Sequence, residues 1–119
     1  MKYVDGYVLP VPKKNLAAYR RMAQEAGKVW MDHGALQFCE CVGDDLKTKM
    51  AVSFPHTIKS KPGETVVFSW IVFKSRAQRD SVNTKVMKDP RLAKMMDMKS
   101  IPFDSKRMVY GGFKTMVDL

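Results

Sequence analysis

The chain has 119 residues, is 45% hydrophobic and carries a formal net charge of +9. This length fits one domain, residues 1–119, and leaves no room for a second core. No stretch approaches the ~18 apolar residues of a membrane span. Asp5 precedes any apolar run, which argues against a signal peptide. We therefore expect a soluble, cytoplasmic protein without a membrane partner.

The basic charge lies in one part of the chain. Residues 1–45 contain six basic and six acidic residues, whereas residues 46–119 contain fifteen basic and six acidic ones. Such an imbalance can indicate an anionic partner such as nucleic acid. Because no run of five or more basic residues occurs, we favour the explanation that scattered lysines keep a small protein soluble.

The first half of the chain predicts a strand, a helix and a second strand. Residues 3–11 are rich in aromatic and β-branched residues and end at prolines, which indicates a strand. Residues 13–33 have the periodicity of an amphipathic helix, and Gly34 stops it. Gly27 inside this helix costs about 1 kcal/mol relative to alanine and so suggests close approach of the helix backbone to the sheet. Residues 35–43 form the next strand.

The second half begins with a long polar connection, residues 46–64, and continues with the most apolar strand, residues 65–74. The near-continuous apolar run indicates burial of both faces of that strand. A helix follows from the capping box at Ser75 to about residue 88. Asp89 and Pro90 start a short extra helix, and residues 106–117 form the last strand.

This order predicts a ferredoxin-like βαββαβ sandwich, with two helices on one face of a four-stranded antiparallel sheet. The other face carries aromatic or β-branched residues on every strand, more than a monomer usually exposes. A second copy packed sheet to sheet would cover it, which predicts a homodimer. Stacked RNA bases are the alternative. The strand 65–74 lacks the glycine of an RNA-recognition motif, so we do not expect a nucleic-acid partner.

Three titratable residues are candidate catalytic groups: Glu40, His33 and Asp5. Glu40 lies on an apolar strand face, where a carboxylate needs a partner or a raised pKa. It is either an acid–base group or one half of a salt bridge, within the sheet or between subunits, to Arg79, Lys106 or Arg107. His33 ends the first helix, as a cap or a general base. Asp5 is expected to meet Arg107 or the Lys106 region across neighbouring strands.

Four residues are candidate ligand contacts: Trp70, Arg79, Arg107 and Tyr110. Gly111 and Gly112 predict a bulge or bend in the last strand, or the close approach of another backbone.

Cys39 and Cys41 alternate onto one strand face, and we expect two reduced thiols. We expect no metal site, because these thiols and two scattered histidines lack zinc-ligand spacing. No dinucleotide, nucleophile-elbow or phosphate-loop motif occurs, so we expect no cofactor.

Several motifs together carry a resemblance over essentially the whole chain. They are Asp5-Gly6-Tyr7-Val8-Leu9-Pro10-Val11-Pro12, Trp30-x-x-His33-Gly34-Ala35-Leu36, Glu40-Cys41-Val42-Gly43-Asp44-Asp45, Phe68-Ser69-Trp70, Arg79-Asp80-x-x-Asn83, Asp89-Pro90-Arg91 and residues 101–113. With these motifs the chain resembles the YbaA-like family of uncharacterised bacterial proteins of unknown function. The resemblance implies a dimeric α+β barrel, and its wider superfamily includes cofactor-independent monooxygenases and small-molecule-binding proteins.

The function that we expect from the sequence is therefore a homodimer that binds a small organic molecule between sheet and helices, with cofactor-independent chemistry as one option. An RNA-binding module that uses the basic second half, and a structural or adaptor dimer without catalysis, remain as alternatives. The sequence leaves open whether the protein is an enzyme.

Overall fold

The computed structural model describes residues 1–97 and 101–119. Its strands are β1 (Tyr3–Pro12), β2 (Gln37–Val42), β3 (Glu64–Phe73) and β4 (Val109–Lys114). Its α-helices are α1 (Leu16–Asp32), α2 (Phe54–Thr57), α3 (Arg76–Met87) and α4 (Pro90–Met96). Short 3₁₀ turns precede α1 and β4. Within the described part of the chain, no helix is long and apolar enough to cross a membrane.

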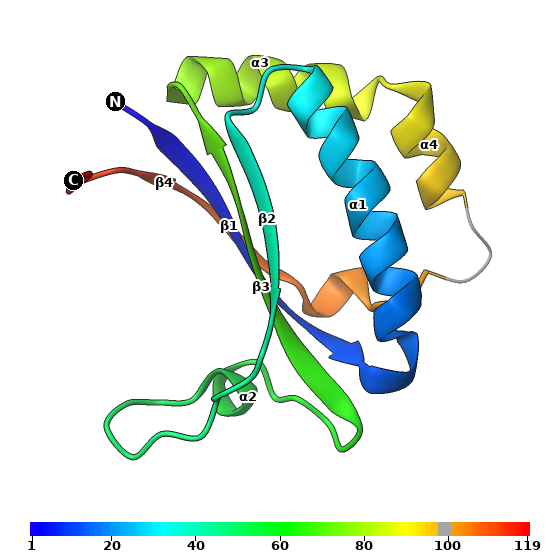
Figure 1. Cartoon of the computed structure of the whole chain (residues 1–119), viewed down its shortest axis with the longest axis vertical. Coiled ribbons are helices and arrows are strands. Elements are labelled where there is room, and N and C mark those ends of the chain that lie inside the picture. Colours follow the sequence, from blue (N-terminus) through cyan, green and yellow to red (C-terminus); the bar gives the residue numbers. More distant parts are fainter. Residues whose placement is uncertain (98–100) are drawn as a thin grey trace.

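The four strands form one sheet in the order β2-β3-β1-β4, and every neighbouring pair is antiparallel. Helices α1, α3 and α4 lie on one side of this sheet, and α2 sits in the connection beyond its lower end (Figure 1). The predicted ferredoxin-like βαββαβ sandwich with an extra short helix is confirmed. Both chain ends lie beside each other at one end of the sheet (Figure 1).

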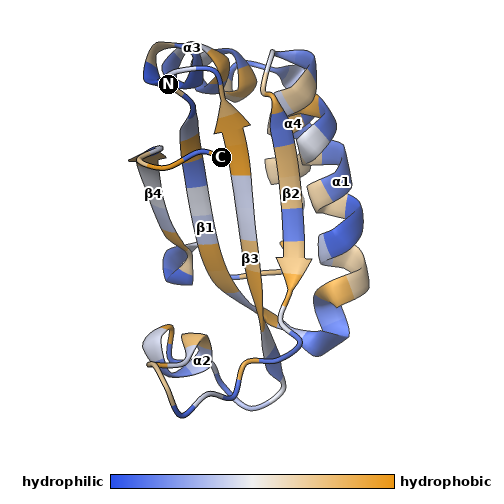
Figure 2. Cartoon of the chain, turned by 60° about the vertical axis from the view of Figure 1, so that its left-hand side comes forward, coloured by the Kyte–Doolittle hydropathy of each residue, from blue (hydrophilic) through white to orange (hydrophobic). Residues whose placement is uncertain are grey.

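The main core lies between the sheet and the helices. Alternate residues of β1 and β3 point to the helices, which is why Leu9, Val11, Val67, Ile71 and Phe73 are at most 2% exposed. They pack against Tyr19, Ala23 and Val29 of α1 and against Val82 and Val86 of α3. Figure 2 shows that β3 is hydrophobic over much of its length. The burial of this face is what fixes the sheet register.

Helix α1 packs closely on β2 at Gly27, as the sequence predicted. A Cβ atom added to Gly27 would lie 2.7 Å from Cδ1 of Phe38, which is closer than side chains pack. The helix ends at Asp32, and Gly34 follows the capping residue His33 with a φ of +114°, a conformation that favours glycine.

Replacing Gly27 by valine should therefore destabilise the fold. The branched side chain would push against the Phe38 ring, and overpacking of this kind costs about 1–3 kcal/mol. We expect a loss of about 2 kcal/mol in the free energy of unfolding, measured by urea denaturation. Ala17→Val is the matched control, because Ala17 is exposed on the same helix and valine there costs only a few tenths of a kcal/mol in helix propensity. Equal midpoints for the two variants would contradict this packing.

Two predicted boundaries differ in the structure. The first helix begins at Leu16 because residues 13–15 form a 3₁₀ turn. The last strand is shorter than predicted, since Asp104 caps a 3₁₀ turn over residues 105–107 and β4 begins only at Val109.

The predicted bulge at Gly111 and Gly112 is absent, because pairing between β1 and β4 is continuous through both residues. Gly112 instead makes room for side chains. A Cβ atom there would lie 2.6 Å from the Tyr3 hydroxyl and 2.5 Å from Nη2 of Arg79. The close approach that the sequence assigned to another backbone is thus made by the side chains of a neighbouring strand and a helix.

The second face of the sheet, which we call the open face, carries apolar side chains that α1, α3 and α4 do not cover, and of the described helices only the short α2 contacts it at one end. Three rings form a chain on it: Phe54 lies 6.0 Å from Phe68, and Phe68 lies 5.6 Å from Trp70. Phe68 is 43% exposed and Phe113 is 62% exposed. The prediction that both faces of strand 65–74 are buried is therefore confirmed for the face toward the helices. On the open face, this single chain leaves part of the strand exposed.

Candidate functional site

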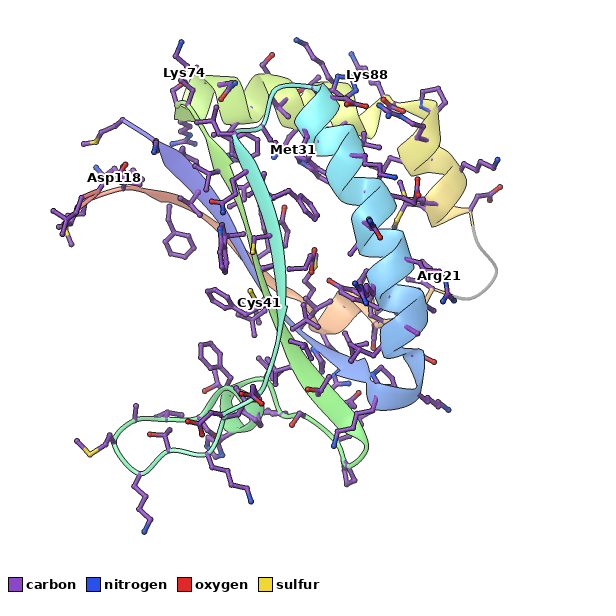
Figure 3. The ribbon with its side chains drawn as sticks, viewed as in Figure 1. Arg21, Met31, Cys41, Lys74, Lys88 and Asp118 are labelled. Carbon is purple, nitrogen blue, oxygen red and sulfur yellow. The ribbon has the colours of Figure 1, made fainter. Side chains whose placement is uncertain are left out.

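A cavity of about 300 Å³ lies between the helix layer and the sheet. Its floor is the helix-facing side of three strands, formed by Tyr7, Leu9, Phe38, Glu40, Ser69 and Ile71. Aromatic side chains of α1 (Tyr19, Trp30) and Phe103 form part of its walls. Five methionines also line it: Met22, Met87, Met95, Met96 and Met108. Figure 3 shows side chains reaching into the layer between α1 and the sheet.

One row of the floor is polar across the whole sheet. Glu40 on β2 pairs with Ser69 on β3, Ser69 pairs with Tyr7 on β1, and Tyr7 pairs with Tyr110 on β4. We call these four residues the polar row. The positions beside it on β2 and β3, and the next one along β1, are apolar: Phe38, Ile71, Val42, Val67 and Leu9. Tyr7 and Tyr110 also touch through their rings, whose centres are 4.9 Å apart.

Glu40 is the only acidic residue among those that line the cavity in the described chain. The hydroxyl of Tyr19 donates a hydrogen bond to its Oε1, over 2.7 Å. Burial raises the pKa of Glu40, and the hydrogen bond from Tyr19 works in the opposite direction. No cation within the described chain forms a salt bridge with Glu40. The predicted pairing with Arg79 or Arg107 is not found within the chain, because both guanidinium groups are engaged elsewhere.

A second hollow, of about 990 Å³, runs outside the cavity between α1 and the edge strand β2. Four residues line both spaces: Tyr19, Ala23, Phe38 and Glu40. The Tyr19–Glu40 hydrogen bond therefore stands between the outer groove and the cavity. The basic side chains of Arg20 and Lys28 lie along the outer groove and not in the cavity.

Asp5 is fully buried beside the cavity but does not line it. Nδ2 of Asn83 donates to Oδ2 of Asp5 over 3.2 Å, and Nε1 of Trp30 donates to Oδ1 of Asn83 over 3.0 Å. Nε of Arg79 lies 3.4 Å from Oδ1 of Asp5, an ion pair whose geometry is too poor for a hydrogen bond.

Arg79 also holds Tyr3, donating to its hydroxyl over 3.1 Å and lying 4.8 Å from its ring centre. Burial raises the pKa of Asp5, while Asn83 and then Arg79 lower it. This network joins α1 and α3 to β1.

The predicted pairing of Asp5 with Arg107 is wrong. Arg107 binds both carboxylate oxygens of Glu64 over 2.7 and 3.0 Å, and it also donates to the Lys59 carbonyl. The reason is positional: Arg107 lies in the turn before β4, level with the first residue of β3 and away from Asp5. The bonds from Arg107 hold the pKa of Glu64 below its usual range.

His33 follows the end of α1 and contacts α4 rather than the cavity. Its Nε2 lies 2.8 Å from Oδ2 of Asp89, the residue that caps α4. Arg91 binds the same carboxylate, and the hydrogen bonds from Arg91 and His33 hold the pKa of Asp89 well below its usual range. This geometry supports the capping role of His33 and places it outside the cavity.

The two aromatic candidate residues, Trp70 and Tyr110, lie in different parts of the structure. Trp70 lies on the open face and donates to Oε1 of Gln37 over 3.3 Å, so it does not line the cavity. Tyr110 ends the polar row at the sheet edge and is 47% exposed.

Cys39 and Cys41 share the open side of β2 as free thiols, with their sulfurs 3.8 Å apart. Among the described residues, no group of three or more His, Cys, Asp or Glu is placed to hold a metal ion. Figure 3 labels Cys41 beside the sheet.

Sequence reasoning missed Tyr7, Ser69 and Tyr19 as site residues. Tyr7 and Ser69 stand next to each other only through the register of β1 and β3. Tyr19 reaches Glu40 only because α1 lies over β2. Side chains alternate along β1, so Tyr7 lies on the same face as Asp5 and Leu9. This alternation was the one signal in the sequence that pointed to Tyr7.

Fold and site together define a ferredoxin-like α+β protein with an apolar cavity under its helices. The chain belongs to the family described as "Protein of unknown function (DUF1428)", whose model matches residues 2–105. It is 43% identical over 118 residues to the uncharacterised protein YbaA of Escherichia coli K12, covering 99% of each chain. YbaA of Shigella flexneri matches to the same extent. The predicted YbaA-like membership is confirmed.

Solved structures show the same fold at low sequence identity. Rv0793 from Mycobacterium tuberculosis matches with a TM-score of 0.60 and 9% identity, covering 99% of this chain and 98% of the other. A dimeric ferredoxin-like protein from an uncultured marine organism gives 0.62 and 9%, with the same coverage. A variant of SnoaB, a cofactor-independent oxygenase from Streptomyces nogalater, gives 0.50 and 10%, covering 99% and 96%. At such identities the likeness concerns the fold alone.

Proposed function

We propose that this protein binds a small organic molecule in the cavity between α1, α4 and the sheet. The observation that carries the proposal is the cavity itself, about 300 Å³ in volume, apolar on most sides and furnished with one carboxyl group. Ligand sites are typically concave and apolar, with a few polar groups that fix orientation. The methionine walls support it too, since these flexible side chains adapt to a ligand's shape.

Glu40 is the group that would carry a proton in any reaction at this site. Burial raises the pKa of its carboxyl group toward the range in which acid–base catalysis operates near neutrality. The fold that this chain shares with a cofactor-independent oxygenase is compatible with such chemistry. Binding comes first in the proposal, and proton transfer by Glu40 is its catalytic extension.

The neutral fluorescent probe N-phenyl-1-naphthylamine tests the binding site, because its emission rises in apolar surroundings and its size suits the cavity. Wild-type protein should give saturable binding. Ala26→Phe, which places a ring in the cavity lining, should weaken binding at least about tenfold, equivalent to about 1.4 kcal/mol. Ala77→Phe on the exposed surface of α3 is the matched control and should bind like wild type.

The open face is a second apolar surface to which the probe could bind. The Ala26→Phe variant distinguishes binding in the cavity from binding on the open face. Probe binding that survives Ala26→Phe undiminished would place the probe on the open face and overturn the proposal. Absence of saturable binding to wild type would overturn it as well. Circular dichroism and a retained unfolding transition confirm that the variants are folded.

We also propose that two copies associate through their open faces. The exposed rings of Phe68 and Phe113 support this, as does the dimeric state named for the marine structural neighbour. Face-to-face sheets about 10 Å apart would bury these rings. Among the described residues, no observation favours the RNA-binding or adaptor alternatives over this assignment.

A further inference from the structure

The polar row on the cavity floor indicates what kind of molecule the cavity accepts. Three of its four members, Glu40, Ser69 and Tyr7, line the cavity. They follow one another on adjacent strands, so their oxygen-bearing groups form a line across a floor that is otherwise apolar. A bound molecule that lies flat on this floor would place one edge along that line.

Burial works against charge on the titratable groups in this line. Burial, and then the neighbouring carboxyl of Asp5, raise the pKa of Tyr7, so its hydroxyl keeps its proton. Burial likewise raises the pKa of Glu40, while the hydrogen bond from Tyr19 lowers it. Hydroxyl and carboxylic acid groups both donate and accept hydrogen bonds, and so they suit the hydroxyl and carbonyl oxygens of a ligand.

Charged ligands fit this environment poorly. No lysine or arginine among the described residues lines the cavity, so a buried anion would lack a counter-ion and would lose its hydration without compensation. A cation would find Glu40 as its only acidic partner in the described lining, already bonded to Tyr19, and it would have to approach a chain of net charge +9. An uncharged molecule meets neither obstacle.

The walls indicate the rest of the ligand. Aromatic and methionine side chains line the space above the floor, and both favour flat, polarisable ring systems. A volume of about 300 Å³ limits the ligand to a few fused or linked rings.

We infer that the ligand of this cavity is an uncharged ring compound with hydroxyl or carbonyl oxygens along one edge, held by Ser69 and Tyr7 and, at the end of the row, by Glu40. This inference rests on the proposed function, since it names the ligand class of the same cavity. Ser69 and Tyr7 would then determine ligand specificity. They would do so by direct contact with the ligand, whether or not a reaction follows.

Three naphthalenes of nearly equal shape test the ligand class by isothermal titration calorimetry: 2-naphthol, which is neutral, 2-naphthoate, which is anionic, and 2-(aminomethyl)naphthalene, which is cationic. We expect 2-naphthol to bind at least about tenfold more tightly than either charged compound, since each would bury an unpaired or repelled charge. The double variant Tyr7→Phe/Ser69→Ala removes two hydroxyl groups without changing the cavity's shape. It should weaken 2-naphthol binding about tenfold or more through the lost hydrogen bonds.

Tyr110→Phe is the control, because Tyr110 ends the same row but lies outside the cavity lining, and it should leave binding unchanged. Equal or tighter binding of the anion or the cation would overturn the inference. So would 2-naphthol binding that the double variant leaves intact. If none of these three compounds binds while N-phenyl-1-naphthylamine does, the ligand class is wrong and the cavity proposal stands. If none of the four probes binds, both fail.

Discussion

Replacing Arg79 by methionine should cost about 3 kcal/mol of stability, because it leaves the carboxyl of Asp5 buried without its cation. Asp5 is 0% exposed, and Arg79 is the cation in contact with it in the described chain. The same substitution removes the hydrogen bond to Tyr3 and the contact with its ring. The free energy of unfolding, measured in urea with tryptophan fluorescence, gives the size of the loss.

The loss should depend on pH in a defined direction. Burial raises the pKa of Asp5 above its value in the unfolded chain. Between these two pKa values the folded state holds more protons than the unfolded state, so stability falls as pH rises. Because Arg79 lowers the Asp5 pKa, its removal extends this window upward. The deficit of Arg79→Met should therefore be smaller near about pH 5 than near about pH 7.

Two further variants make the prediction specific. Arg76→Met changes an exposed arginine of the same helix and should stay within about 0.5 kcal/mol of wild type. Adding Asp5→Asn to Arg79→Met removes the buried charge and should recover part of the loss, since Asn83 can still donate to the new side chain. A stability of Arg79→Met equal to that of Arg76→Met would show that the ion pair contributes nothing.

The second large effect is expected on the open face. Phe68→Asp would place a carboxylate at the centre of the proposed contact between sheets, twice in a symmetric dimer. An unpaired charge that must be buried costs several kcal/mol, so the dimer dissociation constant should rise by more than about a hundredfold. Sedimentation velocity over a range of concentrations would show monomers.

Met31→Asp provides the matched control for the open face. Met31 is 44% exposed and Phe68 is 43% exposed, but Met31 lies on α1, on the other side of the sheet. This control should remain dimeric. Phe113→Asp offers a second position on the open face, on strand β4. A dimer that persists in both phenylalanine variants, or a wild-type protein that is monomeric, would refute association through this face.

Much of the fold follows from patterns that are local in the sequence. The strand at the apolar run of residues 65–74, the stop at Gly34 and the Asp89-Pro90 helix start each depend on a few neighbouring residues, and the structure has all three. Gly27 was informative because a glycine inside a helix is costly unless something lies close to it. Local rules could therefore predict the strands, the other helices, their order and one helix–strand contact, but they missed α2 inside the connection 46–64.

The contacts of the candidate site could not be predicted from local sequence patterns. Asp5 pairs with Arg79 because α3 crosses above β1, and nothing near either residue fixes that crossing. Arg107 was the expected partner of Asp5 because the last strand was predicted to begin at residue 106. In the structure, Arg107 lies in a 3₁₀ turn before the strand and binds Glu64 instead. The polar row exists only through the register between strands that are distant in the sequence.

The contact between Gly27 and Phe38 has a consequence for evolution of the cavity. This glycine sets the distance between α1 and β2, and Phe38 belongs to both the cavity floor and the outer groove. A larger residue at position 27 would move the helix away from the strand and widen the passage beside Glu40. Relatives could therefore exchange stability for a roomier binding site by a single substitution on a helix, without altering any residue that touches the ligand's polar edge.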